Sequence, residues 1–373
     1  MNKDTLSSDG STEIESAEVG VSVLPLRLAS GEFMSTLLAV TIVRLTSRAG
    51  AIGYGYAYAW NTASAQALKV LLLGMLGNVI GLSVHARADM DAVIRREYTS
   101  ILGSRGMAMH GLSAIDIAMW DCACNGLNLS LQAVLGGDRP LVPGYISGAG
   151  LRPEPAAAAS AASALVTKYG LRALKMWVSS GNIAREVQRV AAVRQAIGPD
   201  CKLILDAVKR YSVSDAIHLA EAVHQYDIEW FEDPLEPSVA WQGLAEVGAN
   251  SPVPIGTGED CYDIDDWKRL LDLEAASIVL VDLQRVGGVT GWRIVEALCS
   301  AAGVAVSTHH YPHLGVRLIA SSRRGVFVEY RPWWDEIFGT LDVSNGQLVV
   351  RSGPGVCPAP IVCVEYEFAK QIA

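Results

Sequence analysis

The stretch LILD (203–206) ends in an acidic residue, and so do IEWFE (228–232) and VPIGTGE (253–259). The three acids, Asp206, Glu232 and Glu259, follow short apolar runs at intervals of 26 and 27 residues. An interval of this length accommodates one strand and one helix, and such repeats bring the C-terminal ends of parallel strands to one rim. We therefore expect the three carboxylates to lie near one another at the rim of a barrel.

Strand and helix patterns alternate from about residue 143 onward. Helical patterns such as IAREVQRVAAVRQAIG separate short apolar runs. Eight such runs with helices between them predict an α/β fold with a parallel β/α barrel, whose active site lies at the C-terminal strand ends. The expected strands are residues 144–148, 173–178, 203–207, 228–232, 254–258, 277–282, 305–308 and 326–330.

The residues before the barrel predict a separate α+β domain. Residues 21–60 alternate as in an antiparallel meander, and residues 62–136 have helical spacing. The tail returns to strand and turn patterns and could pack against this first domain. We expect an N-terminal domain of residues 1–140 whose first 20 residues are disordered, a barrel of 141–338, and a C-terminal segment of 339–373 that completes the first domain.

Composition limits the partners and the compartment. Half of the 373 residues are hydrophobic, and the net charge of −9 without a Lys/Arg run argues against nucleic acid or an anionic membrane as partner. The seven cysteines form no CxxC pair, which favours free thiols in a reducing compartment. The polar N-terminus is unlike a signal peptide, and the longest apolar stretch is too short to cross a bilayer. We expect a soluble, cytoplasmic protein that binds a small molecule.

The three strand-end acids are the first candidate site. A set of three carboxylates suits Mg²⁺, with Mn²⁺ as a second possibility. Strand-end acids can also cap the next helix or pair with Lys and Arg, but three in succession favour a metal. Asp233 and Asp260 follow two of the predicted ligands and are better candidates for support of the site or for helix capping.

Asp282 and His309 end the sixth and seventh expected strands, so they are neighbours around the rim. A carboxylate bonded to one imidazole nitrogen raises the basicity of the other, which makes a general base. His310 and His313 are close in sequence, and either a substrate contact or a solvated loop position fits them.

Lys175 and Glu329 are expected at the ends of the second and eighth strands. Lys175 could hold or polarise a substrate carboxylate, with a surface lysine as the alternative. Glu329, if kept protonated, could donate a hydrogen bond to a developing enolate. An ion pair with Arg331 or Arg323 is the alternative for Glu329.

These residues resemble the enolase superfamily, and within it the mandelate racemase subgroup. The resemblance covers nearly the whole chain and rests on AIDIAMWD (114–121) with its LGG ending, WFEDP (230–234) and DLQRVGG (282–288). The position five residues before Gly287 is decisive, because the muconate lactonizing subgroup has lysine where this chain has an aspartate. The resemblance implies a modified (β/α)7β barrel with an α+β capping domain, and homo-oligomers are common in the family.

The resemblance also implies a role for each site residue. Substrate is selected by loops of the cap, here residues 24–34 and 54–62. The family roles carried over are Mg²⁺ ligands for Asp206, Glu232 and Glu259, a base for the His309–Asp282 dyad, and a place beside the enolate for Glu329.

Two positions depart from the subgroup pattern. The second strand ends Lys175-Met176-Trp177 where Lys-x-Lys is usual, and Val208 stands where asparagine is usual. A racemase needs a base on each face of the substrate, so the missing lysine favours a reaction with one base. His309 can remove the proton α to a carboxylate and, as imidazolium, protonate a leaving β-hydroxyl. We therefore expect a Mg²⁺-dependent dehydratase of an acid sugar, with Lys175 on the carboxylate.

Two other functions stay open. One is a racemase or epimerase of a 2-hydroxy acid or related carboxylate, which would use His309 and an unrecognised second base, with Lys175 as one candidate. The other is a catalytically silent binding protein on the same fold, because Trp177 and Val208 occupy positions that are usually polar. Substrate contacts are expected from Trp177, Tyr54 and His310, in a pocket with further aromatic side chains.

Overall fold

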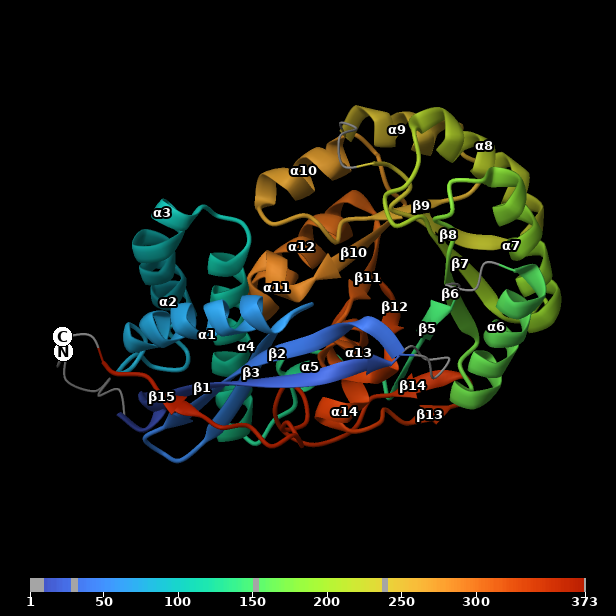
Figure 1. Ribbon diagram of the computed structural model, residues 1–373. Helices are drawn as coiled ribbons and strands as arrows, with labels where there is room; N and C mark the ends of the chain where they lie inside the picture. Colours follow the sequence, from blue (N-terminus) through green and yellow to red (C-terminus); the bar gives the residue numbers. More distant parts are fainter. Residues whose placement is uncertain (1–9, 28–32, 150–153, 237–240, 372–373) are drawn as a thin grey trace.

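The computed structural model describes residues 10–27, 33–149, 154–236 and 241–371. Eight strands, all parallel, close a barrel in the order β10-β11-β12-β5-β6-β7-β8-β9 (Figure 1). All eight predicted barrel strands are confirmed, with small differences at their ends. Their bounds are β5 (Gly144–Ala149), β6 (Ala173–Trp177), β7 (Lys202–Asp206), β8 (Ile228–Glu232), β9 (Ile255–Thr257), β10 (Ile278–Asp282), β11 (Ala305–His309) and β12 (Gly325–Tyr330).

Helices surround the barrel, and the sequence marks where several of them begin. In α7 the side chain of Asn182 accepts a hydrogen bond from the Arg185 N–H, and in α8 Ser212 accepts one from the Asp215 N–H. The inner faces of these helices bury apolar side chains against the strands. The helices are α6 (Pro155–Tyr169), α7 (Ile183–Ile197), α8 (Val213–Val223), η3 (His224–Tyr226), α9 (Trp241–Asn250), α10 (Ile264–Asp272), α11 (Leu283–Val286), α12 (Gly288–Ala302) and α13 (Pro312–Ser321).

The interior of the barrel is packed. Tyr145, Ala173, Ile204 and Trp230 form one buried cluster inside it. Lys175 follows Ala173 by two residues on β6, so it points to the same inner face one layer higher. The packed layer forms a floor beneath the C-terminal rim, and the rim is therefore the place where polar side chains can meet.

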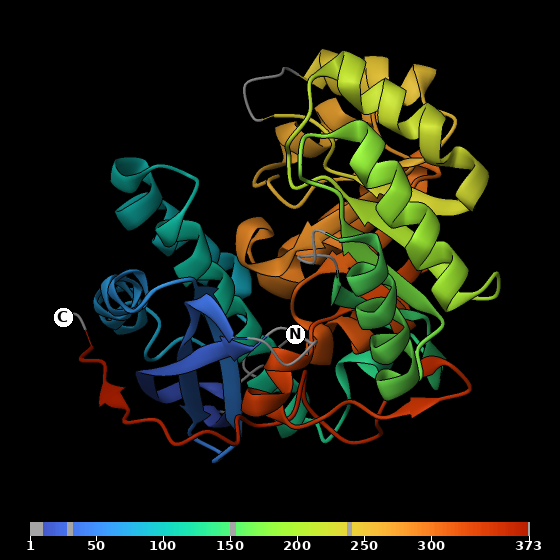
Figure 2. The same cartoon turned by 45° about the vertical axis from the view of Figure 1, so that its right-hand side comes forward.

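A second body stands beside the barrel (Figures 1 and 2). Its antiparallel sheet has the order β15-β1-β2-β3, and its helices lie next to this sheet. The structure therefore has the predicted architecture of a barrel with an α+β cap. Its elements are η1 (Gly10–Thr12), β1 (Ile14–Arg27), β2 (Phe33–Ser47), β3 (Ile52–Ala59), α1 (Thr62–Gly77), α2 (Arg87–Ile94), η2 (Arg95–Thr99), α3 (Ser100–Leu102), α4 (Met107–Gly126), α5 (Leu131–Val134) and β15 (Glu367–Phe368).

The start of the cap corrects one expectation. We expected residues 1–20 to be disordered, but residues 10–20 form η1 and the first part of β1. Ala17 and Val19 pair with Leu45 and Val43 of β2 and are buried against the cap helices. Burial of Ala17 and Val19 stabilises this strand, although the polar residues around them in the sequence indicate disorder. Residues 1–9 lie outside the described residues.

Strand β3, IGYGYAYA, alternates between very small and aromatic residues. The small residues face α4, and a Cβ added at Gly55 would lie 1.9 Å from the carbonyl oxygen of Ala114 on that helix. Tyr56 and Tyr58 face the barrel, where the ring of Tyr56 stacks 4.8 Å from that of Tyr311 and the ring of Tyr58 lies 4.4 Å from that of His310. The strand thus brings aromatic side chains from the cap to the barrel.

The C-terminal part of the chain connects the two bodies. After the barrel, the chain forms η4 (Pro332–Trp334) and α14 (Asp335–Phe338). The strands β13 (Val343–Ser344) and β14 (Gln347–Val349) follow, and β14 pairs with β4 (Leu141–Val142) to complete a small sheet. Beyond it, β15 pairs with β1, so the tail returns to the first sheet as the pattern suggested.

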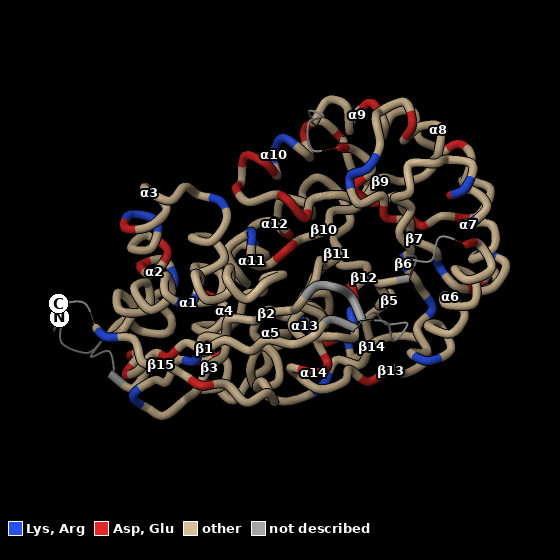
Figure 3. The backbone as a smooth tube through the Cα atoms, viewed as in Figure 1, with Lys and Arg blue, Asp and Glu red and all other residues tan. Residues whose placement is uncertain are grey.

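Residues of both charge signs occur throughout the described part of the chain. Lys and Arg are spread over the molecule rather than gathered in one stretch of the described chain (Figure 3). Over the same residues, no helix is both long enough and apolar enough to cross a membrane.

Candidate functional site

The three strand-end acids lie at the C-terminal rim. Asp206 and Glu232 are the last residues of β7 and β8 and are direct partners in the register, while Glu259 lies two residues beyond β9. Among the described residues, no three acidic, histidine or cysteine side chains converge as a set of metal ligands. Two lysine ammonium groups lie on these carboxylates instead.

The first ammonium group belongs to Lys175, which is fully buried and not at the surface. Its Nζ contacts a carboxylate oxygen of Glu232 and lies 3.3 Å from Asp206 Oδ2 and 3.0 Å from Glu329 Oε1. Burial lowers the pKa of Lys175, but the charges of Glu232 and Glu329 outweigh it and hold the pKa well above its ordinary value. Lys175 is therefore a permanent cation among three carboxylates.

The structure brings His309 and Asp282 together at the ends of β11 and β10. His309 Nδ1 lies 2.7 Å from Asp282 Oδ2, and Asp282 Oδ1 accepts the Gln284 N–H at 2.9 Å. The other ring nitrogen, Nε2, lies 3.0 Å from Glu259 Oε2. Burial raises the pKa of Asp282, but the hydrogen bond and charge of His309 outweigh it, so the pKa is lower than usual. Asp282 is an ionised, fully buried partner for the imidazole.

Tyr58 of the cap joins this pair, a contact that the sequence analysis did not predict. Its hydroxyl donates to Asp282 Oδ2 at 2.7 Å, the oxygen that also faces His309. Its backbone N–H donates to Gln284 Oε1 at 3.0 Å. Burial raises the pKa of Tyr58 well above its ordinary value, so the hydroxyl stays a donor. Tyr58, on β3 of the cap, therefore helps to hold Asp282 of the barrel in position.

Glu329 is charged in this arrangement. It is fully buried, and its Oε1 lies 2.8 Å from an Arg331 guanidinium nitrogen, while its Oε2 accepts the His310 N–H at 2.8 Å. Burial raises the pKa of Glu329, but Arg331 and Lys175 outweigh it and hold the pKa well below its usual value. The expectation of a protonated Glu329 is not met, because two buried cations stabilise its anion. The ion pair with Arg331 is the alternative that the structure shows.

Two of the three predicted substrate contacts lie at this rim. Trp177 ends β6 and pairs in register with Asp206. The His310 ring is buried between Tyr58, with centroids 4.4 Å apart, and His309, with centroids 4.5 Å apart. Burial lowers the pKa of His310 well below its ordinary value, so this imidazole is neutral.

Tyr54 and His313 are not part of this cluster. Tyr54 lies four residues before Tyr58 on an extended strand, about 13 Å along it. It lines a separate cavity of about 410 Å³ with Asp121 and Cys357. His313 is buried in α13, and its Nε2 lies 2.6 Å from the Gly339 carbonyl oxygen. His313 packs in the core, which is neither of the two alternatives that the sequence left open.

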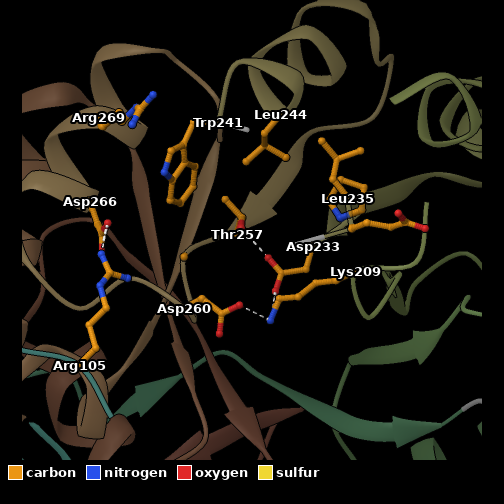
Figure 4. Close-up of a pocket in the computed structure, with 13 residues that line it drawn as sticks. Arg105, Lys209, Asp233, Leu235, Trp241, Leu244, Thr257, Asp260, Asp266 and Arg269 are labelled. Carbon is orange, nitrogen blue, oxygen red and sulfur yellow. Dashed lines mark hydrogen bonds and ion pairs between the residues drawn. The ribbon is translucent and has the colours of Figure 1, made fainter. Parts of the chain in front are cut away.

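The second ammonium group, Lys209, was also missed by sequence reasoning. Val208, where the subgroup has asparagine, is half exposed, and the chain then places Lys209 beside Glu259, with 2.6 Å between Nζ and Oε1. Asp233 and Asp260, expected to support the site or cap helices, are the other partners of Lys209. These residues border a cavity of about 580 Å³ between β8, β9 and α10 (Figure 4).

Two family models match the chain. The model described as "Mandelate racemase / muconate lactonizing enzyme, N-terminal domain" matches residues 11–136, and "Enolase C-terminal domain-like" matches residues 157–357. A closed β/α barrel with acids at its rim, covered by an α+β domain, is the architecture of the enolase superfamily. The chain belongs to the mandelate racemase/muconate lactonizing enzyme family within it.

Known relatives support this placement over most of their length. The L-talarate/galactarate dehydratase of Salmonella typhimurium is 26% identical over 86% of this chain and 80% of its own. The 3,6-anhydro-alpha-L-galactonate cycloisomerase of Streptomyces coelicolor is 28% identical over 82% of this chain and 84% of its own. A solved racemase structure from Streptomyces coelicolor with bound magnesium has a TM-score of 0.83 at 26% identity, covering 92% of this chain and 96% of that one.

Proposed function

We propose that this chain is a dehydratase of a sugar-derived carboxylic acid that uses one acid/base group, His309. The observation that carries the proposal is the His309–Asp282 pair at the rim without a second base among the described neighbours. Trp177 stands where a second lysine would act, and Lys175 is held as a cation by three carboxylates. A racemase that uses Lys175 as its second base is therefore disfavoured.

The rim residues fit a hard divalent cation. Asp206, Glu232 and Glu259 offer oxygen ligands on three adjacent strands, the donor set that Mg²⁺ and Mn²⁺ prefer. Burial raises the pKa of Glu232 well above its usual value, and the charges of Asp206 and Glu329 raise it further against the effect of Lys175. A cation bound beside Glu232 would favour its ionised form against this burial. When bound there, the cation would stabilise the charge that develops on the substrate carboxylate.

The residues of this chain supply the proton transfers. Asp282 accepts from Nδ1 of His309, which leaves Nε2 to take the proton α to the carboxylate. The imidazolium that results then donates the same proton to the β-hydroxyl, which leaves as water. The enol that remains becomes a 2-keto-3-deoxy acid. Lys175 would neutralise charge on the substrate carboxylate, and Glu329 holds Lys175 and the His310 backbone in place.

The substrate class follows from the relatives and the rim together. The names of the two curated relatives describe enzymes that act on acids derived from sugars. We extend this class to the present chain, with Trp177 and His310 as substrate contacts and part of the cap as the selecting surface. Residues 28–32 of the expected 24–34 loop lie outside the described residues. We also propose a cytoplasmic homo-oligomer and the domain limits 1–140, 141–338 and 339–373.

The test is a screen of aldonic and aldaric acids with Mg²⁺, read by colorimetric detection of 2-keto-3-deoxy products. Solvent deuterium incorporation at the α-carbon is measured in parallel by NMR. We expect a keto-deoxy product from at least one acid and its loss in H309N. The matched control H224N changes an exposed histidine far along the chain and should leave the product unchanged.

Two outcomes of the screen would reject the dehydratase. Epimers or α-deuterium exchange without elimination would assign the chain to the racemases and epimerases. No product and no exchange with any acid would support a silent binding protein, which Trp177 and Val208 suggested from the sequence.

A further inference from the structure

Lys209 reaches the rim through an unusual backbone. Both Val208 and Lys209 have positive φ angles, of 50° and 57°, a region that L side chains rarely adopt and β-branched residues least of all. Two hydrogen bonds hold this turn: the Val208 N–H donates to Asp206 Oδ1 at 2.9 Å, and the Lys209 N–H donates to the Asp233 carbonyl at 2.8 Å. The chain thus accepts strain in a turn that directs this side chain inward.

The ammonium group of Lys209 bridges three carboxylates. Its Nζ lies 2.6 Å from Glu259 Oε1, 2.6 Å from Asp260 Oδ2 and 3.4 Å from Asp233 Oδ2. Figure 4 shows the Lys209 nitrogen directed toward Asp260 and lying below Asp233, which also accepts a hydrogen bond from Thr257. Of its three partners, Glu259 belongs to the proposed metal site, whereas Asp233 and Asp260 do not.

Glu259 has no free oxygen in this arrangement. Lys209 occupies Oε1, and His309 Nε2 lies 3.0 Å from Oε2. A divalent cation that binds either oxygen of Glu259 would therefore lie next to one of these groups, and the Lys209 ammonium would repel it. Lys209 can leave Glu259 and still be neutralised, because Asp233 and Asp260 remain within reach.

We propose that Lys209 competes with the divalent cation for Glu259, and that it moves onto Asp233 and Asp260 when the cation binds. This inference rests on the proposed function, since it takes Glu259 as a ligand. Lys209 then sets the affinity of the site for the cation. The positive charge of Lys209 that stabilises Glu259 is the same charge that would weaken binding of the metal.

The sign of the effect follows from Coulomb's law. A monovalent and a divalent charge held about 5 Å apart repel strongly enough, at the effective dielectric of a protein surface, to change an affinity by at least about tenfold. The K209M variant removes the charge but retains a long side chain. We expect it to bind Mg²⁺ and Mn²⁺ at least about tenfold more tightly than the parent protein.

The experiment is titration calorimetry with Mg²⁺ or Mn²⁺ alone, on the full chain without substrate. K209R keeps the charge and should bind within about threefold of the parent. K202M removes a lysine that pairs with Glu229 at the protein surface, so it matches the change in net charge and should also bind as the parent does. Thermal unfolding of each variant checks that it is folded, with K209Q as a substitute if K209M is not.

A double variant identifies where the metal binds. In K209M/E259Q the gain in affinity should disappear, because the third ligand is gone. A gain that persists would place the cation on the freed Asp233 and Asp260 and overturn the proposal, as would equal or weaker binding by K209M alone. Failure of the dehydratase assays with this binding result intact would reject the reaction and leave the role of Lys209 standing. Absence of binding in every variant would overturn both.

Discussion

The hydroxyl of Tyr58 provides the sharpest test of the link between the cap and the base. Tyr58→Phe removes one hydrogen bond to the buried, ionised Asp282 and leaves the ring in its packing. Asp282 keeps His309 and the Gln284 N–H, so one of three contacts is lost. A hydrogen bond to a charged group contributes about 1.5–3 kcal/mol. If that contribution orients His309 for proton transfer, kcat falls about ten- to a hundredfold.

The kinetic constants separate this role from a general loss of structure. Because the Tyr58 hydroxyl faces Asp282 and not the substrate, KM should stay within about threefold of the parent value. Tyr56→Phe is the matched control, since Tyr56 lies on the same face of β3 and its buried hydroxyl has no hydrogen-bond partner among the described residues. It should leave kcat within about twofold. An unchanged kcat in the Tyr58 variant, or equal losses in both variants, would refute the reasoning.

Three further changes test other parts of the site and fold. Lys175→Met leaves three buried carboxylates without their shared cation and should cost about 3–5 kcal/mol of unfolding free energy, measured with urea; a loss below 1 kcal/mol would contradict the burial argument. Trp177→Lys restores a base on the second face, so NMR should detect α-deuterium exchange with both epimers of the substrate, and exchange with one epimer alone would count against it. Burial lowers the pKa of His110 to about 4, so between pH 6.5 and 4 the unfolded chain binds more protons and stability falls as the pH falls. His110→Gln should flatten this dependence of the thermal midpoint, and an unchanged slope would exclude His110 as its source.

The barrel and its rim could be predicted because local patterns determine them. Each strand is a short apolar run, and a parallel sheet places the last residue of one strand beside the last residue of the next. The register confirms this for Asp206 beside Glu232 and for Asp282 beside His309. Spacing along the chain therefore translated directly into proximity at the rim.

Other parts of the site depend on tertiary contacts that no local pattern contains. Tyr58 and Asp282 are 224 residues apart and meet only because the cap docks on the barrel. The charge of Glu329 depends on Arg331 and Lys175, which are buried beside it. The position of Lys209 depends on a strained turn that its sequence does not indicate. These three features could be identified only from the folded structure.

The alternation in β3 gives its two faces different roles: the small residues pack against α4, and the aromatic residues lie on the opposite face. Gly53 and Gly55 touch the backbone of α4, where even a methyl group would collide, so those positions tolerate almost no variation. The aromatic positions that alternate with the small residues, Tyr54, Tyr56 and Tyr58, face away from the helix and are free of that constraint. Changes at these aromatic positions therefore leave the contact between β3 and α4 intact and act on the contact with the barrel instead. Of the three tyrosines, Tyr58 is the one that donates a hydrogen bond to Asp282. A cap that replaced this one would therefore need to provide the same hydroxyl or another donor to Asp282.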